Sequence, residues 1–162
     1  MATKVIRYQI ADYIEIKGSG SSTTYALMGT GFNTLDESPN AQLDQKTYIS
    51  DKSQSTTVKS YQPQFAFDTD LIADEQAVME LYNIGRDQKT GADAEREYIR
   101  VDLFDKTSDG KYPARKFKVA VEVTSFSGSG GEVVTASGNL NAIGDFVEGT
   151  FDTATKTFTA AS

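Results

Sequence analysis

The sequence contains no cysteine and no histidine among its 162 residues. The absence of cysteine excludes disulfide bonds, thiolate metal sites and cysteine nucleophiles. The absence of histidine removes the commonest general base near neutral pH and the commonest transition-metal ligand. We therefore expect a protein that is not an enzyme and that holds no metal ion or cofactor.

Long apolar runs are also absent. The longest, such as those at residues 26–28 and 119–121, fall far short of the roughly 20 residues that a membrane-spanning helix needs. The N-terminus has no apolar core of the kind, about 7 to 15 residues long, that a secretory signal requires. We expect no membrane segment and synthesis in a cytoplasm.

Positive charge is scarce in this chain. Its 16 basic and 23 acidic residues give a net charge of −7, and residues 61–100 hold nine acids against four bases. Tight binding of DNA is not expected, because affinity for phosphate comes from Lys and Arg. The plainest interpretation of the acidity is that it keeps the protein in solution. With 38% apolar residues the chain should fold, and its length suits a single domain, residues 1–162.

Apolar and polar residues alternate along much of the chain, as they do in half-buried β-strands. Residues 112–126 show the pattern best, because Phe117, Val119 and Val121 alternate with polar side chains. Residues 10–16, 61–68 and 99–103 show it too, with Arg100 expected on the water side. Further strands are predicted at 23–29, 132–143, 147–152 and 156–159. The last two form a terminal hairpin, with Gly144 at a corner and Gly149 relaxing a bend or bulge.

One segment has helical rather than strand spacing. Between residues 71 and 84, Ala77, Val78, Leu81 and Ile84 fall on one face, and Gly85 follows as a stop signal. We expect one amphipathic helix that lies across a sheet and buries its Val78 and Leu81 side. The fold class is therefore mainly β: an antiparallel β-sandwich or partial barrel flanked by one α-helix.

Residues 33–55 look like a long connection between strands. They are polar, contain a proline and exceed the usual length of a loop in a domain of this size. Such a loop is either an arm that contacts a partner or a mobile surface loop. The residues that would make contacts in the first case are Leu35, Pro39, Leu43, Tyr48 and Ile49.

Several motifs resemble ligand sites but lack a necessary member. The run from Asp105 to Gly110 begins like a calcium loop, but Lys116 stands where the closing glutamate belongs, so a tight turn is expected. Exposed tyrosines such as Tyr98 and Tyr112 could stack on sugars, which keeps a carbohydrate-binding or host-adhesion module open as an alternative. Without tryptophan that alternative has little support.

Four stretches of the sequence together resemble a known family. They are residues 28–42 (MGTGFNTLDESPNAQ), 82–95 (YNIGRDQKTGADAE), 114–121 (ARKFKVAV) and 138–152 (GNLNAIGDFVEGTFD). In this order, and over most of the chain, they resemble the major tail tube proteins of long-tailed bacteriophages and their prophages. The most characteristic part is 144–152, where a small-residue corner leads into the final hairpin.

The resemblance implies a subunit that forms a homo-hexameric ring, with rings stacked into a hollow tube that conducts the genome from capsid to host cell. It also implies synthesis in the bacterial cytoplasm, a place in the virion tail, and contact with tape measure, tail terminator and baseplate or tip proteins. DNA would pass through the lumen without specific binding. The loop at 33–55 would contact neighbouring subunits or rings. Tube subunits of tail-derived bacteriocins and secretion systems remain an alternative.

Overall fold

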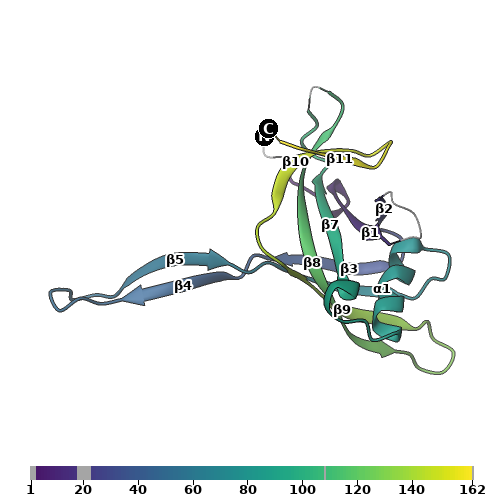
Figure 1. The fold of residues 1–162 in the computed structure, drawn as a ribbon, viewed down its shortest axis with the longest axis horizontal. Helices are drawn as coiled ribbons and strands as arrows, with labels where there is room; N and C mark the ends of the chain where they lie inside the picture. Colours follow the sequence, from purple (N-terminus) through teal and green to yellow (C-terminus); the bar gives the residue numbers. More distant parts are fainter. Residues whose placement is uncertain (1–2, 18–22, 108, 162) are drawn as a thin grey trace.

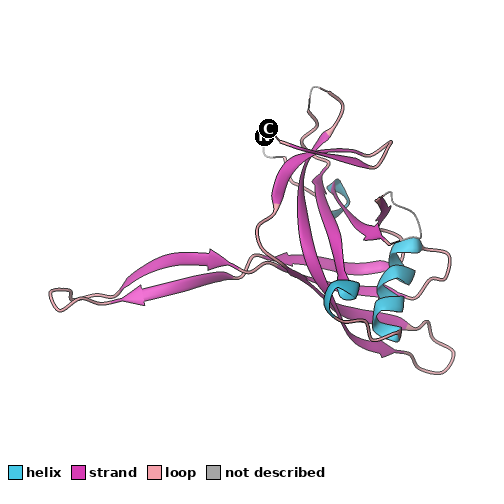
Figure 2. Ribbon diagram, in the orientation of Figure 1, coloured by secondary structure: helices cyan, strands magenta, loops and turns pink. Residues whose placement is uncertain are grey.

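A curled antiparallel sheet that forms a half-barrel dominates the computed structural model, which describes residues 3–17, 23–107 and 109–161 (Figures 1 and 2). Its strand order is β2-β1-β7-β8-β9-β6-β3. The prediction of a mainly β fold with one helix is confirmed. The strands are β1 (Ile10–Ile16), β2 (Thr24–Leu27), β3 (Phe32–Ser38), β6 (Gln64–Asp70), β7 (Glu95–Asp102), β8 (Tyr112–Ser127) and β9 (Thr135–Ala142).

The chain ends in the hairpin that the sequence predicts, formed by β10 (Val147–Asp152) and β11 (Thr157–Ala160). Gly144 does stand at the corner before it, with φ of 71° in the left-handed region that favours glycine. The prediction for Gly149 was wrong. The strand pairs in unbroken register on both sides there, and a Cβ would lie 2.1 Å from the carbonyl oxygen of Thr159. Glycine is needed for this close approach of two backbones, with no bulge present.

Two apolar clusters lie on opposite faces of β1 and β7. Inside the curl, Ile14 and Tyr98 pack with Phe65, Phe117 and other side chains. On the outer face, Tyr13 and Ile99 pack under Phe151 of the terminal hairpin. The two strands are therefore covered on both sides. The expectation that alternate residues of both strands face water was wrong, and Arg100 points into the protein with 6% of its surface exposed.

The α-helix α1 (Gln76–Arg86) packs against β8, β1 and β2. Val78 and Leu81 are buried as predicted. The helix begins five residues later than expected and continues through Gly85. A Cβ at Gly85 would lie 2.8 Å from the side chain of Val123, so this glycine lets the helix approach β8. Among the described residues, no helix is both long and apolar enough to cross a membrane.

Residues 33–55 are not the long irregular loop that the sequence suggested. They contain most of β3, all of β4 (Ala41–Lys46) and the turn that leads into β5 (Ser55–Tyr61). β4 and β5 pair only with each other in the described structure, as a separate two-stranded sheet. This hairpin, called the arm below (residues 41–61), projects away from the body of the protein (Figure 1).

Candidate assembly surfaces

The arm has no interior of its own. Every residue from 38 to 62 is exposed, including its large apolar side chains. Leu43 and Val58 face each other across the two strands with 54% and 49% of their surfaces exposed, and Ile49 at the tip is fully exposed. An isolated two-stranded hairpin is at best marginally stable in water. The apolar side chains of the arm are therefore available to another surface.

Short-range contacts shape the two ends of the arm. At the tip, the amide of Tyr48 donates to the Asp51 carboxylate over 3.1 Å, and the Lys46 ammonium lies 5.1 Å from the Tyr48 ring. At the root, the amide of Gln62 donates to the carbonyls of Pro39 and Asn40 over 3.1 and 3.2 Å. The two strands therefore leave the body side by side.

The outward face of β3, β6, β9 and the C-terminal half of β8 carries acidic and uncharged polar residues. Neighbours across the strands include the sets Asp36, Ala66, Asn139 and Glu122, and Ser38, Gln64, Asn141 and Ala120. Hydrogen bonds join them, such as those from Asn139 and Asn141 to the Glu122 carboxylate over 3.2 and 3.3 Å. We call this set the polar face; its members are Thr34, Asp36, Ser38, Gln64, Ala66, Asp68, Asp70, Ala120, Glu122, Ser125, Ser127, Thr135, Ser137, Asn139 and Asn141.

The polar face contains four carboxylates and no lysine or arginine. The nearest lysine along β8 on the same side, Lys118, is paired with Glu95 over 3.2 Å. All charges on the polar face are therefore negative. A phosphate backbone within about 8 Å of this face would be repelled at physiological salt.

Two strand edges border the polar face. β3 pairs with β6 on one side only among the described strands. β8 pairs with β7 through Ala120 and with β9 from Val119 to Ser127, so its last residues have β9 on one side alone. Open edges of this kind tend to pair with other chains.

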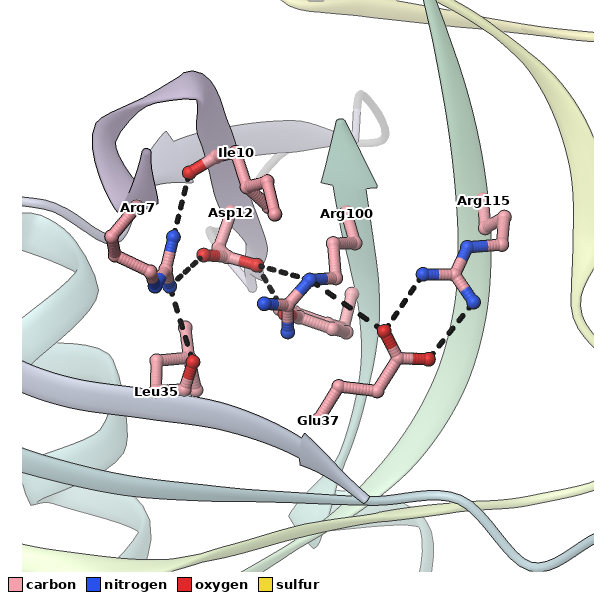
Figure 3. Close-up of polar contacts among 8 residues, drawn as sticks. Arg7, Ile10, Asp12, Leu35, Glu37, Arg100 and Arg115 are labelled. Atoms are coloured by element: carbon pink, nitrogen blue, oxygen red, sulfur yellow. Dashed lines mark hydrogen bonds and ion pairs between the residues drawn. The ribbon is translucent and has the colours of Figure 1, made fainter. Parts of the chain in front are cut away.

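A charge cluster lies inside the curl near the root of the arm (Figure 3). Arg115 of β8 donates two hydrogen bonds to the Glu37 carboxylate of β3, over 2.8 and 2.9 Å. The Arg100 Nε atom lies 3.8 Å from both Glu37 Oε1 and Asp12 Oδ1. Arg7 binds Asp12 over 2.7 Å and the carbonyl of Leu35 over 3.1 Å. We call Arg7, Asp12, Glu37, Arg100 and Arg115 the charge cluster.

Burial and charge act in opposite directions on the pKa of Glu37. Burial alone would raise the pKa of Glu37, but the hydrogen bonds and charge of Arg115, together with the charge of Arg100, lower that pKa below its ordinary value. For Tyr98, burial and then the charge of Asp12 raise the pKa well above its ordinary value. The Tyr98 hydroxyl therefore stays protonated and donates to Asp12.

No family model and no curated protein matches this sequence, but solved structures match the fold. The SPP1 tail tube, determined by solid-state NMR and cryo-EM, aligns with a TM-score of 0.67 at 12% identity, over 90% of this chain and 78% of that chain. The tail of a gene transfer agent particle, refined with C6 symmetry, aligns with a TM-score of 0.58 at 12% identity, over 91% and 95% of the two chains. This chain has the tail tube fold.

A third match is the baseplate of the anti-feeding prophage, in a 6-fold symmetrised structure. Its TM-score is 0.55 at 6% identity, and the alignment covers 91% of this chain and 97% of that chain. The fold of this chain thus matches chains of three assemblies, although the sequence identities are only 6% to 12%.

Within this tail tube fold, the five predicted contact residues separate into two groups. Leu43, Tyr48 and Ile49 lie in the arm and Pro39 at its root, all of them exposed. Leu35 lies in β3 with 2% of its surface exposed and belongs to the core. Its position in the chain suggested an exposed loop, but its alternation with Asp36 is the pattern of a strand.

Sequence reasoning missed the charge cluster entirely. A signal was present in β1, because both of its faces carry residues suited to a core. One face carries Ala11 and Tyr13, and the other carries Ile10 and Ile14. A strand that is apolar in both phases is covered on both faces, so Asp12 within it must find partners inside the protein. The tyrosine prediction was also wrong for Tyr98, which is fully buried and offers no platform for a sugar.

Proposed function

We propose that this protein is the structural subunit of a phage-type tail tube, in which six copies form a ring and the rings stack into a hollow conduit for DNA. The fold supports this proposal, and so does the sixfold symmetry of the gene transfer agent tail and the anti-feeding prophage baseplate. The role is structural rather than catalytic. In the described residues there is also no cluster of three or more acidic side chains suited to a metal ion.

The observation that carries the proposal is the exposed arm. Its apolar pair, Leu43 and Val58, faces across the two strands and leaves 54% and 49% of the two surfaces exposed. Its three lysines and two aspartates give it a net charge of +1 within a chain of net charge −7. A weakly positive, partly apolar arm fits the surface of an acidic neighbour, and the neighbour in a tube is another copy of the same chain.

The two open edges support closure into a ring. If β3 of one copy pairs with the C-terminal half of β8 of the next, the polar faces of six copies join into one continuous inner wall. Closure also fixes the number of copies and removes both of these edges from uncontrolled pairing. The polar face would then line the lumen, where its carboxylates repel the passing phosphates.

The same proposal places the protein in the virion tail after synthesis in the host cytoplasm. Its partners are further copies of itself along the tube and the tape measure, tail terminator and baseplate or tip proteins at the ends. A single domain of this size suits a subunit repeated many times along a tube.

Negative-stain microscopy of purified protein tests the proposal. We expect rings and tubes whose number grows with protein concentration. The pair of changes Leu43→Ser and Val58→Ser should abolish stacking, whereas Asp44→Ser and Thr57→Ser, a facing pair of polar residues on the same two strands, should leave it intact. Wild-type protein that stays as single particles under every assembly condition would refute the proposal.

A tube subunit of a tail-derived bacteriocin or secretion system is the second candidate. The likeness to the anti-feeding prophage baseplate favours it. Particles isolated from the producing cells separate the two: tubes attached to DNA-filled capsids indicate a phage, and tubes without capsids indicate the second candidate.

A further inference from the structure

The arm joins the body through two short segments, residues 39–40 and 62–63. Only Pro39 and Asn40 separate β3 from β4, and Asn40 has a positive φ of 52°. Bonds between these two segments, such as that from the Asn40 side chain to the carbonyl of Gln62 over 3.2 Å, hold the two strands together at the joint. Beside the joint, β3 pairs with β6 up to Ser38 and Gln64, so whatever fixes the end of β3 also fixes the start of the arm.

The charge cluster meets the arm-bearing strand just before this joint. Glu37 is the next-to-last residue of β3, and its carboxylate receives both hydrogen bonds of Arg115 from β8. Two parallel hydrogen bonds between a planar guanidinium and a planar carboxylate fix orientation as well as distance. The end of β3 therefore has a fixed orientation relative to β8.

A second tie reaches β3 from the N-terminal segment. Arg7 donates to the carbonyl of Leu35 on the β3 edge while its guanidinium also binds Asp12 of β1. Arg100 of β7 lies between Asp12 and Glu37 and joins the two halves of the cluster. Thus β3, which has a strand neighbour on one side only, is held to β1, β7 and β8 across the curl (Figure 3).

The energetics of the cluster favour a role in geometry over one in stability. Moving charges out of water costs about as much as their attraction returns, and apolar side chains of similar size would stabilise a core at least as well. The side chains of Arg100 and Asp12 are nonetheless only 7% and 2% exposed. A buried ionic cluster differs from an apolar one because an arrangement that leaves one of its charges unpaired is strongly destabilising.

We infer that the charge cluster is a clamp that fixes the direction in which the arm leaves the body, with Glu37 as its positioning residue. A ring of six such arms then points uniformly at the copies that receive them. The consequence for stacking rests on the proposed function, whereas the consequence for arm direction in a single subunit does not.

The chain contains no cysteine, so two introduced cysteines are the only sites for spin labels. Thr57→Cys on the arm and Ala66→Cys on β6 place both labels at exposed positions. Pulsed EPR on the monomer measures the distribution of distances between them. In this background, Glu37→Gln removes the negative charge of Glu37 from the clamp. Glu97→Gln is the matched control. It breaks a partly exposed ion pair with Lys116, in which the Lys116 nitrogen and the Glu97 oxygen lie 3.2 Å apart, and this pair lies away from the arm.

We expect a narrow distance distribution in the parent protein and the control, and a broad one in Glu37→Gln. The variant should also need at least about tenfold more protein than the control to form tubes, as sedimentation would measure. A folded Glu37→Gln protein with a distribution as narrow as the parent would overturn the clamp. If the parent forms no tubes, the proposed function fails. The distances between the spin labels in the monomer still show whether the clamp fixes the direction of the arm.

Arg115→Lys covers the case in which Glu37→Gln does not fold. This change keeps the positive charge but cannot make two parallel hydrogen bonds to Glu37. We expect a folded protein with a broadened distance distribution. A narrow distribution, or failure of both variants to fold, would show that the cluster belongs to the core and does not aim the arm.

Discussion

Val119 and Ala120 are consecutive residues of β8 that face opposite environments. Val119 points into the core with none of its surface exposed, and Ala120 belongs to the polar face. Val119→Asp would bury an unpaired carboxylate at a cost of about 4 kcal/mol or more, which is a large share of the roughly 5–15 kcal/mol that stabilise a domain. We expect this variant not to fold, as circular dichroism would show. Ala120→Asp is the control and should unfold near the parent temperature; parent-like melting of Val119→Asp would contradict the burial of this side chain.

Glu37 makes the stability of the protein depend on pH in acid. Because its pKa in the folded protein lies below the ordinary value of 4.5, its pairing stabilises the fold fully above that value. The contribution is lost as the pH falls through the lowered folded pKa. Urea unfolding across this window should show a steeper fall in the free energy of unfolding for the parent than for Glu37→Gln. Equal slopes in the two proteins would contradict the lowered pKa.

Among the elements, the arm shows how a segment can be regular without a core. Its two strands are held by backbone pairing and by the bonds at tip and root, and no residue from 38 to 62 is buried. Its structure therefore adds little to the stability of the body, which keeps both of its apolar clusters without it.

Replacing residues 41–61 by an Asn-Gly turn should give a folded monomer that never stacks. The ends can be joined because the Gln62 amide already lies 3.2 Å from the Asn40 carbonyl, and Asn-Gly suits a two-residue hairpin. Analytical ultracentrifugation and thermal unfolding measure the two properties. Deleting 35–49 instead should unfold the protein, because it removes the buried Leu35 and the end of β3. Tubes formed by the armless protein would refute the stacking role of the arm.

For the whole molecule, the distribution of charge matters more than its sum. The polar face has four acids and no base, whereas the outer side of β7 and β8 carries paired charges such as Lys116 with Glu97. A net charge of −7 would be compatible with many arrangements. The arrangement found here keeps lysine and arginine away from one continuous face.

Reversing charge on the polar face should convert the conduit into a DNA-binding surface. Asp68→Lys with Glu122→Lys leaves two acids and two lysines on the face of each copy, and tubes of this variant should retain DNA with an affinity that falls steeply with salt. Glu132→Lys with Glu148→Lys makes the same change in net charge at exposed positions outside the face. Filter binding compares the two kinds of tube, and equal retention by both would show that the polar face does not line the lumen.

Most strands of the body and the helix could be predicted from local pattern, because alternation and helical spacing report which side of an element is buried. Boundaries were less accurate where packing gave a residue another role, as at Gly85. This glycine lies inside the helix and allows close contact with Val123, whereas the local signal indicated a stop. The arm was taken for a loop because its residues alternate only weakly between apolar and polar, and the burial that produces strong alternation is missing there.

By itself, the sequence determined the mainly β class, the single helix, the terminal hairpin and the absence of cysteine and histidine chemistry, since these follow from composition and from the spacing of neighbours along the chain. Only the tertiary structure decided that Leu35 is core and the arm is exposed, that Asp12 and Arg100 meet inside the curl, and that one face is free of positive charge. The reason is physical: these properties depend on which distant strands lie side by side, and residues 28 positions apart, such as Arg7 and Leu35, leave no periodic trace of their contact.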